Sequence, residues 1–443
     1  MRIFALGAST LLGFPNPLNT SFPHFLELML ADAYPEKRFE VFNCGITAIN
    51  TFCLLDFVDE LVDYEPDLIV LYSGHNEFVG PYGVTTPFLR MGNDRTWIRC
   101  FMFLQRSRIY YYLKEGIHQV REWLRPAAAE EGFGLHLFDR EISPQHPGYR
   151  ITGENYRANL EEMLRTAERH QVPVLLSTLV SNLHFYPFRS TCDLSRMTLE
   201  VASLERQNRL PEAIQIGEET LAQAPECANV HYELGRLHYR QGAYEQAHRH
   251  LARARDLDRL PFRAPGTFNQ TIRDLVRDRP GVLLADSERA LSAAAGHGII
   301  GNDLITEYLH PTVYGHYLMA RTMLEELVQQ GADRNWGAAD TTRLQPYQSY
   351  AERLGYGPGE QVFYRTDLML FLSRMPYQEP PTILRRYVAQ LMYRQIQEFY
   401  QLTPPQRQTF ALKSQPVLVR LLDFLLPDDR QVLAEMLLSL EGR

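Results

Sequence analysis

The chain has 443 residues, 45% of them hydrophobic and 22% charged, a composition typical of a globular protein that buries its own core. Its formal charge of -8 and its lack of a dense Lys/Arg stripe argue against nucleic acid as a partner. No stretch approaches the roughly 18 apolar residues of a membrane span, and the N-terminus does not resemble a signal peptide. We therefore expect a soluble, unexported chain as written. Because Met1 leads directly into the first predicted strand, a longer parent protein in the cell envelope stays open.

Five short apolar runs, separated by segments with helical spacing, are suited to buried parallel strands. They are Ile3–Leu6, Phe39–Asn43, Leu68–Tyr72, Val172–Val180 and Val282–Ala285. Alternation of this kind predicts an α/β fold with helices on both faces of one parallel sheet. In such a sheet the loops after the strands form the ligand crevice, so the residues that follow each run are the candidates for function.

The segment 194–260 has a different character and repeats itself at an offset of 34 residues. The offset pairs Ala213 with Ala247 and Asn208 with Gly242, and the pattern resembles about two tetratricopeptide units. We expect a helical insertion that leans on the main domain, because two repeats are too few to be stable alone. Whether its concave face also binds a protein partner stays open. Its four histidines, at helical spacing, are expected on a solvated face rather than at a metal; they are His231, His238, His248 and His250.

The rest of the chain divides around this insertion. We predict a main domain from 1–193 and 261–332, with a helical extension over 333–443 in which no residue suggests chemistry. The five cysteines are odd in number, widely spaced and free of any C-x-x-C pair, so we expect buried free thiols rather than disulfides or a zinc site. They are Cys44, Cys53, Cys100, Cys192 and Cys227.

Four polar segments follow predicted strands or precede a helix, in a fixed order along the chain. They are Gly7-Ala8-Ser9-Thr10, Asn43-Cys44-Gly45, Ser73-Gly74-His75-Asn76 and Glu307-Tyr308-Leu309-His310. Each alone is a weak signal. Together, this order of Ser, Gly, Asn and a late acid-x-x-His resembles the four blocks of the SGNH (GDSL-like) hydrolase family, and in particular its tetratricopeptide-containing members. The resemblance covers roughly 1–185 and 262–330, and it implies a three-layer, flavodoxin-like parallel sheet.

The resemblance implies a serine esterase, and the chemistry of the residues agrees with it. A serine hydroxyl needs a base whose pKa lies near the working pH, so His310 would activate Ser9. The imidazole needs an acceptor for its other N–H, and the family's spacing gives that role to Glu307. The developing oxyanion needs preorganised donors, for which the candidates are the Ser9 N–H, the Gly45 N–H and the Asn76 amide.

Two positions depart from the family pattern. Ala8 stands where the first block commonly has Asp, which changes the support of the loop more than the chemistry. Glu307 stands where the acid is commonly Asp, so Asp303, upstream on the chain, is the reserve acid. If neither carboxylate reached the ring, a Ser9–His310 dyad would remain.

Several other residues are candidates for a substrate pocket. His75, Phe78, Tyr82 and Phe88 lie in or after the Asn76 block, and Arg263 would suit an anionic group. The leading hypothesis is an esterase that removes a small acyl group, such as acetyl on a carbohydrate, without a cofactor or metal. Two alternatives stay open: an O-acyltransferase that passes the acyl group to a polysaccharide, and a catalytically idle scaffold that binds a protein through the repeats.

Overall fold

The computed structural model describes residues 1–86, 93–108, 141–192, 195–331, 336–373 and 382–441, together with Tyr110, Tyr112 and Glu115. Phe88 lies outside the described residues. Five strands form one parallel sheet in the order β2-β1-β3-β4-β5, which is the flavodoxin-like order. The strands are β1 Arg2–Gly7, β2 Glu40–Gly45, β3 Leu68–Tyr72, β4 Val174–Ser177 and β5 Val282–Ala285. The predicted α/β fold class is confirmed.

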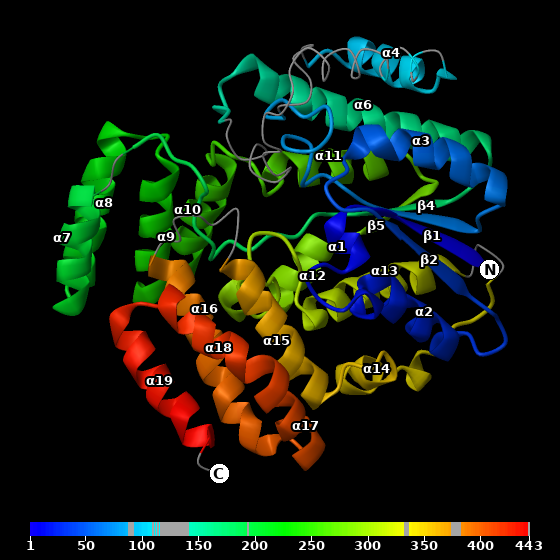
Figure 1. Ribbon diagram of the computed structural model, residues 1–443. Helices are drawn as coiled ribbons and strands as arrows, with labels where there is room; N and C mark the ends of the chain where they lie inside the picture. Colours follow the sequence, from blue (N-terminus) through cyan, green and yellow to red (C-terminus); the bar gives the residue numbers. More distant parts are fainter. Residues whose placement is uncertain are drawn as a thin grey trace.

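Helices cover both faces of the sheet and make the three layers (Figure 1). On one face lie α3 (Thr51–Leu61), α6 (Pro147–Arg169) and α11 (Gly266–Arg277), with α4 (Arg95–Gln105) outside α6. On the other lie α2 (Phe22–Ala33), α12 (Ser287–Ala294) and α13 (Val313–Gly331). These helices bury apolar stripes, which is why their sequences repeat with helical spacing.

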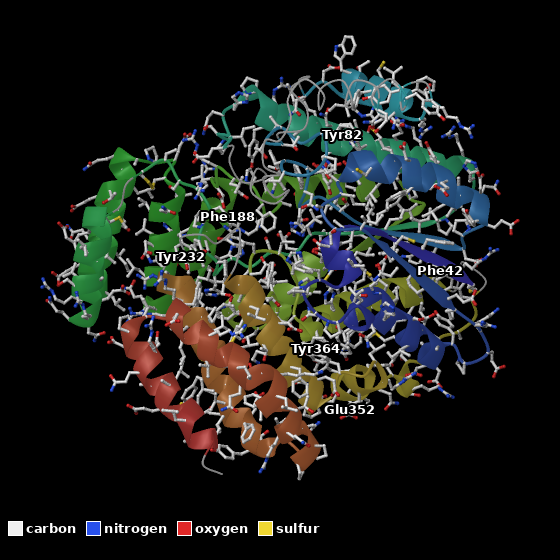
Figure 2. The ribbon with its side chains drawn as sticks, in the orientation of Figure 1. Phe42, Tyr82, Phe188, Tyr232, Glu352 and Tyr364 are labelled. Atoms are coloured by element: carbon white, nitrogen blue, oxygen red, sulfur yellow. A yellow bond between two sulfur atoms is a disulfide. The ribbon has the colours of Figure 1, made fainter. Side chains whose placement is uncertain are left out.

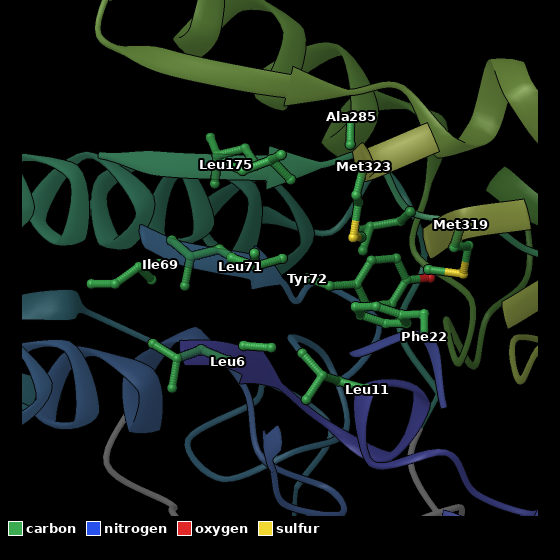
Figure 3. Close-up of a cluster of buried hydrophobic side chains, with 14 of the residues drawn as sticks. Leu6, Leu11, Phe22, Ile69, Leu71, Tyr72, Leu175, Ala285, Met319 and Met323 are labelled. Carbon is green, nitrogen blue, oxygen red and sulfur yellow. The ribbon is translucent and has the colours of Figure 1, made fainter. Parts of the chain in front are cut away.

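The core between the sheet and α2/α13 places the carboxyl ends of the strands (Figure 3). All five residues of β3 are buried, as expected for a central strand covered on both faces. The ring of Tyr72, at the end of β3, packs edge-to-face on Phe22 with centroids 5.7 Å apart. Met319 and Met323 of α13 fill the same layer and are fully buried. Buried apolar surface stabilises the fold by roughly 25 cal/mol per Å², so this layer holds the strand ends in fixed positions.

Strand β4 is shorter than the predicted run Val172–Val180 because side chains capture the backbone after Ser177. The Leu179 N–H donates to Asn269 Oδ1 at 2.7 Å, and the Val180 N–H donates to the Tyr72 hydroxyl at 3.2 Å. These bonds replace sheet pairing, so the chain leaves the sheet at the edge where the polar segments gather.

The insertion forms two helical hairpins, seen in green on the left of Figure 1. The helices are α7 Ser195–Arg206, α8 Leu210–Gln223, α9 Ala228–Gln241 and α10 Tyr244–Asp256. Asn208 and Gly242, the pair predicted at an offset of 34, both adopt left-handed backbone, with φ of 58° and 84°. At Gly235 a Cβ would lie 2.6 Å from Leu251 Cγ, so a small residue there lets α9 and α10 approach closely.

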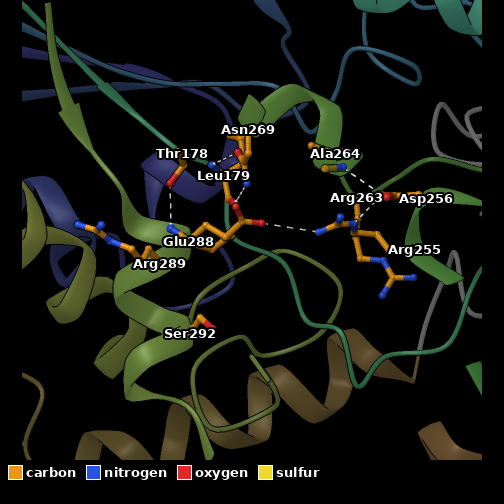
Figure 4. A network of polar contacts seen from close by, with 12 residues as sticks. Thr178, Leu179, Arg255, Asp256, Arg263, Ala264, Asn269, Glu288, Arg289 and Ser292 are labelled. Carbon is orange, nitrogen blue, oxygen red and sulfur yellow. Dashed lines mark hydrogen bonds and ion pairs between the residues drawn. The ribbon is translucent and has the colours of Figure 1, made fainter. Parts of the chain in front are cut away.

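Polar contacts fasten the insertion to the main domain. The hydroxyl of Tyr232 on α9 donates to the His184 carbonyl at 2.9 Å (Figure 2). Figure 4 shows Arg255 of α10 beside Asp256, and the Arg255 Nη1 lies 3.9 Å from Glu288 Oε1 on α12. The Gly266 N–H, at the start of α11, donates to Asp256 Oδ1 at 3.0 Å.

The C-terminal region is helical and packs beside the loop that carries His310. Its helices are α14 Tyr347–Arg353, α15 Pro358–Leu372, α16 Thr382–Glu398, α17 Pro404–Thr409, α18 Gln415–Leu421 and α19 Pro427–Glu441. Apolar side chains of α15, α16, α18 and α19 share one buried cluster with Phe185, Tyr308 and Leu309, while Tyr350 of α14 packs in the core of the main domain. The extension therefore packs directly against the loop of the candidate site.

The expectation of five buried free thiols is wrong. Cys192 and Cys227 form a disulfide between the segment ahead of α7 and the start of α9, because the hairpin fold brings together two positions 35 residues apart. Cys100 is free but exposed, while Cys44 and Cys53 are free and half-buried. Over the described ranges, no helix is both long enough and apolar enough to cross a membrane.

Candidate active site

Ser9 stands where the first strand turns into a helix. β1 ends at Gly7, and Ser9 opens the short helix α1 (Ser9–Leu12), which closes at Gly13 with φ of 107°. Gly7 has no room for a side chain, since a Cβ would lie 2.3 Å from the Tyr72 carbonyl oxygen of the neighbouring strand. This tight turn holds the half-buried Ser9 at the carboxyl edge of the sheet.

His310 meets Ser9 from a loop 301 residues further along the chain. Its Nε2 lies 2.8 Å from Ser9 Oγ, and its Nδ1 bonds Glu307 Oε1. With the proton assigned to Nδ1, the serine hydroxyl donates to Nε2 and the ring donates to the carboxylate. The structure thus brings Ser9, His310 and Glu307 into one hydrogen-bonded chain.

Glu307 is fully buried, and donors surround its carboxylate. Besides the ring N–H, Oε1 accepts the His310 backbone N–H at 3.2 Å, and Oε2 accepts the Tyr308 N–H. Asp303, the reserve acid, is exposed, and it is the backbone carbonyl of Asp303 that accepts a bond, from the Thr312 hydroxyl at 3.1 Å. Of the two predicted acids, it is Glu307 that contacts the imidazole.

Two further histidines lie near His310 and are held neutral. Burial lowers the pKa of His75 to about 3, and burial lowers the pKa of His316 to about 3, with the nearby His310 adding to both shifts. Both ring nitrogens of His75 are engaged: Nδ1 accepts the Ala264 N–H at 3.1 Å, and Nε2 lies 3.2 Å from the Tyr72 hydroxyl. His75 is therefore a buried support, which corrects its assignment to the substrate pocket.

The oxyanion candidates differ in how free their donors are. One N–H of the Asn76 amide donates to the Ile49 carbonyl at 2.9 Å, which fixes the side chain in place. Its second N–H has no acceptor among the described residues. The Gly45 N–H, by contrast, already donates to Asn43 Oδ1 at 3.0 Å, and Gly45 packs so closely on α1 that a Cβ would lie 2.5 Å from Leu12 N. In this structure the Gly45 N–H, a predicted oxyanion donor, is therefore engaged by Asn43.

Sequence reasoning did not predict how the end of β2 and the loop after it support these groups. Asn43 bridges β2 to α1, since its amide donates to the Leu11 carbonyl and to Ser21 Oγ, both at 3.0 Å. Ala48, in the loop after β2, adopts a left-handed backbone with φ of 63°, a conformation that is uncommon for a residue with a Cβ. Alanine gives no sequence signal for such a turn, so the strained position was visible only in the structure.

The C-terminal extension also reaches the site, contrary to the expectation that it carries nothing relevant to chemistry. The ring of Phe14 packs edge-on to His310 with centroids 5.2 Å apart, and Phe371 of α15 packs edge-on to Phe14 at 5.0 Å. These rings shield the imidazole from water on one side. No residue pattern in the extension pointed to this contact.

Three pocket candidates are corrected by their surroundings. Phe78 is fully buried and stacks on Phe268, because its loop folds back into the core between α6 and α11. Tyr82 packs on Phe52 of α3, and its hydroxyl donates to Gln105 Oε1 of α4 (Figure 2). Arg263 is 2% exposed and donates to the backbone carbonyls of Asn182 and Phe185, so it ties loops together rather than meeting an external anion.

Glu77, next to Asn76, anchors this loop to α3. Its two carboxylate oxygens accept the Thr51 N–H at 2.9 Å and the Thr51 hydroxyl at 2.7 Å. Burial raises the pKa of Glu77 from 4.5 to about 7, although the bonds from Thr51 favour its charged form. The folded state therefore holds more protons than the unfolded state between pH 4.5 and 7.

We predict that this carboxyl makes the protein less stable as pH rises through that window. The free energy of unfolding should fall by about 3 kcal/mol from pH 4.5 to 7 through Glu77 alone. Urea unfolding of the wild type and of Glu77→Gln at pH 4.5, 6 and 8 measures this, since the variant should lack that part of the decline. Glu60→Gln, at an exposed position on α3, is the matched control. Parallel pH curves for wild type and Glu77→Gln would contradict the prediction.

Three of the four histidines of the insertion contact one another. Nδ1 of His231 lies 3.0 Å from Nδ1 of His250, and the His238 ring stacks on His250 with centroids 5.4 Å apart. Burial lowers the pKa of His250 to about 4, with the two neighbouring histidines adding to the shift. Within the part of the chain that the structure describes, no group of three or more His, Cys, Asp and Glu side chains has the arrangement of a metal site.

Comparison with known proteins gives one family match and several weak structural likenesses. The family model described as "Tetratricopeptide repeat" matches residues 204–261, most of the predicted insertion. No curated protein matches the chain.

The solved structures that resemble this one include a member of the lipolytic protein G-D-S-L family from Veillonella parvula, at 11% identity and a TM-score of 0.34, covering 73% of this chain and 97% of that one. The acetylxylan esterase Axe2 from Geobacillus stearothermophilus is 11% identical with a TM-score of 0.34, covering 74% and 93%. An acetyl xylan esterase, AlAXEase, is 10% identical with a TM-score of 0.36, covering 73% and 98%. At these values the likenesses assign no activity to the chain.

Proposed function

We propose that this protein is a serine esterase of the SGNH (GDSL-like) type that hydrolyses a small acyl ester, with O-acetyl on a carbohydrate as its substrate. One observation carries the proposal: the 2.8 Å contact between Ser9 Oγ and His310 Nε2, with Glu307 bonded to the other ring nitrogen. Covalent acyl transfer requires a nucleophile bonded to its base, and that base bonded to an orienting acid.

The reaction follows from this chain of bonds. His310 Nε2 takes the hydroxyl proton as Ser9 Oγ bonds to the acyl carbon, and buried Glu307 stabilises the imidazolium that forms. The carbonyl oxygen gains negative charge, which the Asn76 amide N–H and the Ser9 N–H are proposed to bind. The tetrahedral intermediate then expels the alcohol, which receives the proton from His310, and acyl-Ser9 remains.

The second half-reaction repeats these steps with water. His310 removes a proton from water, the hydroxide adds to the acyl carbon, and Ser9 Oγ leaves with the proton returned by the imidazole. If a sugar hydroxyl entered in place of water, the same acyl-enzyme would yield an O-acyltransferase. The two outcomes differ only in the second nucleophile.

The test is release of p-nitrophenol from p-nitrophenyl acetate, with and without a polysaccharide acceptor. Hydrolysis predicts equal release of acetate and p-nitrophenol under both conditions. Acetylated polysaccharide formed at the expense of free acetate would replace the esterase by the transferase. If no p-nitrophenol appeared at all, the catalytic proposal would fail, and a scaffold that binds a protein through the repeats would take its place.

A further inference from the structure

A cavity of about 260 Å³ lies between the main domain and the C-terminal helices, and the reaction above leaves it unused. Tyr314, at the start of α13, faces it from the main domain. From the C-terminal region it is faced by Tyr347 of α14, Tyr356 of the turn after α14 and Tyr364 of α15. Tyr364 is labelled on α15 in Figure 2. The volume is far above the ~30 Å³ that one water occupies and somewhat below the ~300 Å³ at the lower end of small-molecule pockets. It therefore suits a ligand the size of a monosaccharide unit.

The cavity lies behind the loop that carries the candidate catalytic residues. Thr306 and Thr312, which flank Glu307 and His310 in sequence, both line it. The Thr306 N–H donates to the His310 carbonyl at 2.7 Å, so this loop is closed on itself. Asn16, a further lining residue, donates its amide to the Pro311 carbonyl at 2.8 Å. A ligand in the cavity would thus contact the same short loop that presents the imidazole to Ser9.

The walls combine aromatic faces with uncommitted hydroxyls. The rings of Tyr314 and Tyr347 meet edge-on with centroids 5.0 Å apart, and those of Tyr356 and Tyr364 lie 6.1 Å apart at 32°. Among the described residues, none of these four hydroxyls has a hydrogen-bond partner. None is sealed in the core either, so they open onto the cavity or solvent. Burial raises the pKa of Tyr347 to about 12, which keeps that hydroxyl neutral and able both to donate and to accept.

Three charged side chains line the cavity: the exposed carboxylate of Asp303 and the guanidinium groups of Arg365 and Arg394. Arg365 is held by Glu398 at 2.7 Å and is not available. Arg394 of α16 is exposed, lines the cavity, and has no ion-pair partner within the described ranges. A guanidinium in this state can bind a carboxylate by two parallel bonds.

These features select among ligand classes. An acyl chain would leave the tyrosine hydroxyls and the Asn16 side chain facing apolar groups, which costs free energy. A pyranose ring presents C–H faces to aromatic rings and hydroxyls to phenols and amides, and so satisfies both kinds of wall. We propose that this cavity is a sugar-binding subsite that holds one ring of the polysaccharide bearing the ester. The claim that the bound polysaccharide carries the ester rests on the proposed function, whereas the claim that the cavity binds a sugar does not.

The experiment measures sugar binding directly, by isothermal titration of Ser9→Ala protein with xylotetraose, a neutral probe, and tetragalacturonate, an anionic one. At least one should bind, and adding Tyr364→Ala or Tyr314→Ala should weaken binding about three- to tenfold. Adding Arg394→Ala should weaken tetragalacturonate more than xylotetraose. Tyr393→Ala is the matched control, since Tyr393 is 45% exposed on α16 beside Arg394 and does not line the cavity.

Two results would overturn the inference: neither probe binding at concentrations on the order of 10 mM, or the Tyr393→Ala control weakening binding as much as the cavity variants. Arg394→Ala, at an exposed position, provides a reading if a tyrosine variant fails to fold. Sugar binding without hydrolysis of p-nitrophenyl acetate would refute the proposed function and leave the subsite standing. Hydrolysis of p-nitrophenyl acetate without sugar binding would refute the subsite and leave the proposed function standing.

Discussion

Replacing Ser9 with alanine should abolish ester hydrolysis, lowering kcat by a factor on the order of 10⁶. The variant keeps the fold, because Ser9 is half-buried at the start of α1 and its side chain bonds only His310 among the described residues. Without Oγ no acyl-enzyme can form, and His310 is left to act on water alone. Initial rates with p-nitrophenyl acetate, corrected for its spontaneous hydrolysis, measure the effect.

Ser73→Ala is the matched control for this loss. Ser73 follows β3 at the same edge of the sheet, and its buried hydroxyl has no hydrogen-bond partner among the described residues. Its removal should leave the rate within about twofold of wild type. Ser9→Ala protein that kept a substantial share of the wild-type rate would rule out Ser9 as the nucleophile.

Glu307→Gln should lower kcat by about 10³- to 10⁴-fold while the protein stays folded. A glutamine can present an N–H to Nδ1 of His310, which favours the tautomer with the proton on Nε2. That tautomer cannot accept the Ser9 proton. The neutral amide also no longer stabilises the imidazolium. Steady-state kinetics together with a thermal melt separate this loss from unfolding.

Asp303→Asn tests the alternative acid on the same loop. Its side chain is exposed and the contact with His310 belongs to Glu307, so hydrolysis of p-nitrophenyl acetate should change little. The opposite ranking, with Asp303→Asn the more damaging change, would transfer the orienting role to Asp303. Equal and small effects of both would leave a Ser9–His310 dyad.

The sheet could be predicted from sequence because each buried strand is a continuous apolar run between segments with helical spacing. The same logic brought Ser9 and Asn76 to one edge, since parallel strands share their carboxyl ends. His310 follows no strand and reaches that edge from the loop ahead of α13. The hydrogen-bond partners of the donors at that edge could not be predicted in the same way. The Gly45 N–H is taken by Asn43, a contact two residues away that depends on how β2 meets α1.

Contacts that no motif marks were beyond sequence reasoning for a physical reason. Phe371 and Arg263 owe their roles to what packs beside them: one joins Phe14 next to His310, and the other holds two loops inside the core. An aromatic residue on a helix and an arginine in a loop look the same whether they meet solvent, ligand or protein. The Cys192–Cys227 pair was missed likewise, because its closeness depends on the hairpin fold.

The most direct test is the site of covalent modification by a fluorophosphonate probe. An activated serine attacks phosphorus and releases fluoride, so the probe marks the hydroxyl that its base has deprotonated. Peptide mass spectrometry should find one adduct on Ser9, and both Ser9→Ala and His310→Ala proteins should remain unlabelled. Labelling of a different serine in a protein that hydrolyses p-nitrophenyl acetate would contradict the account.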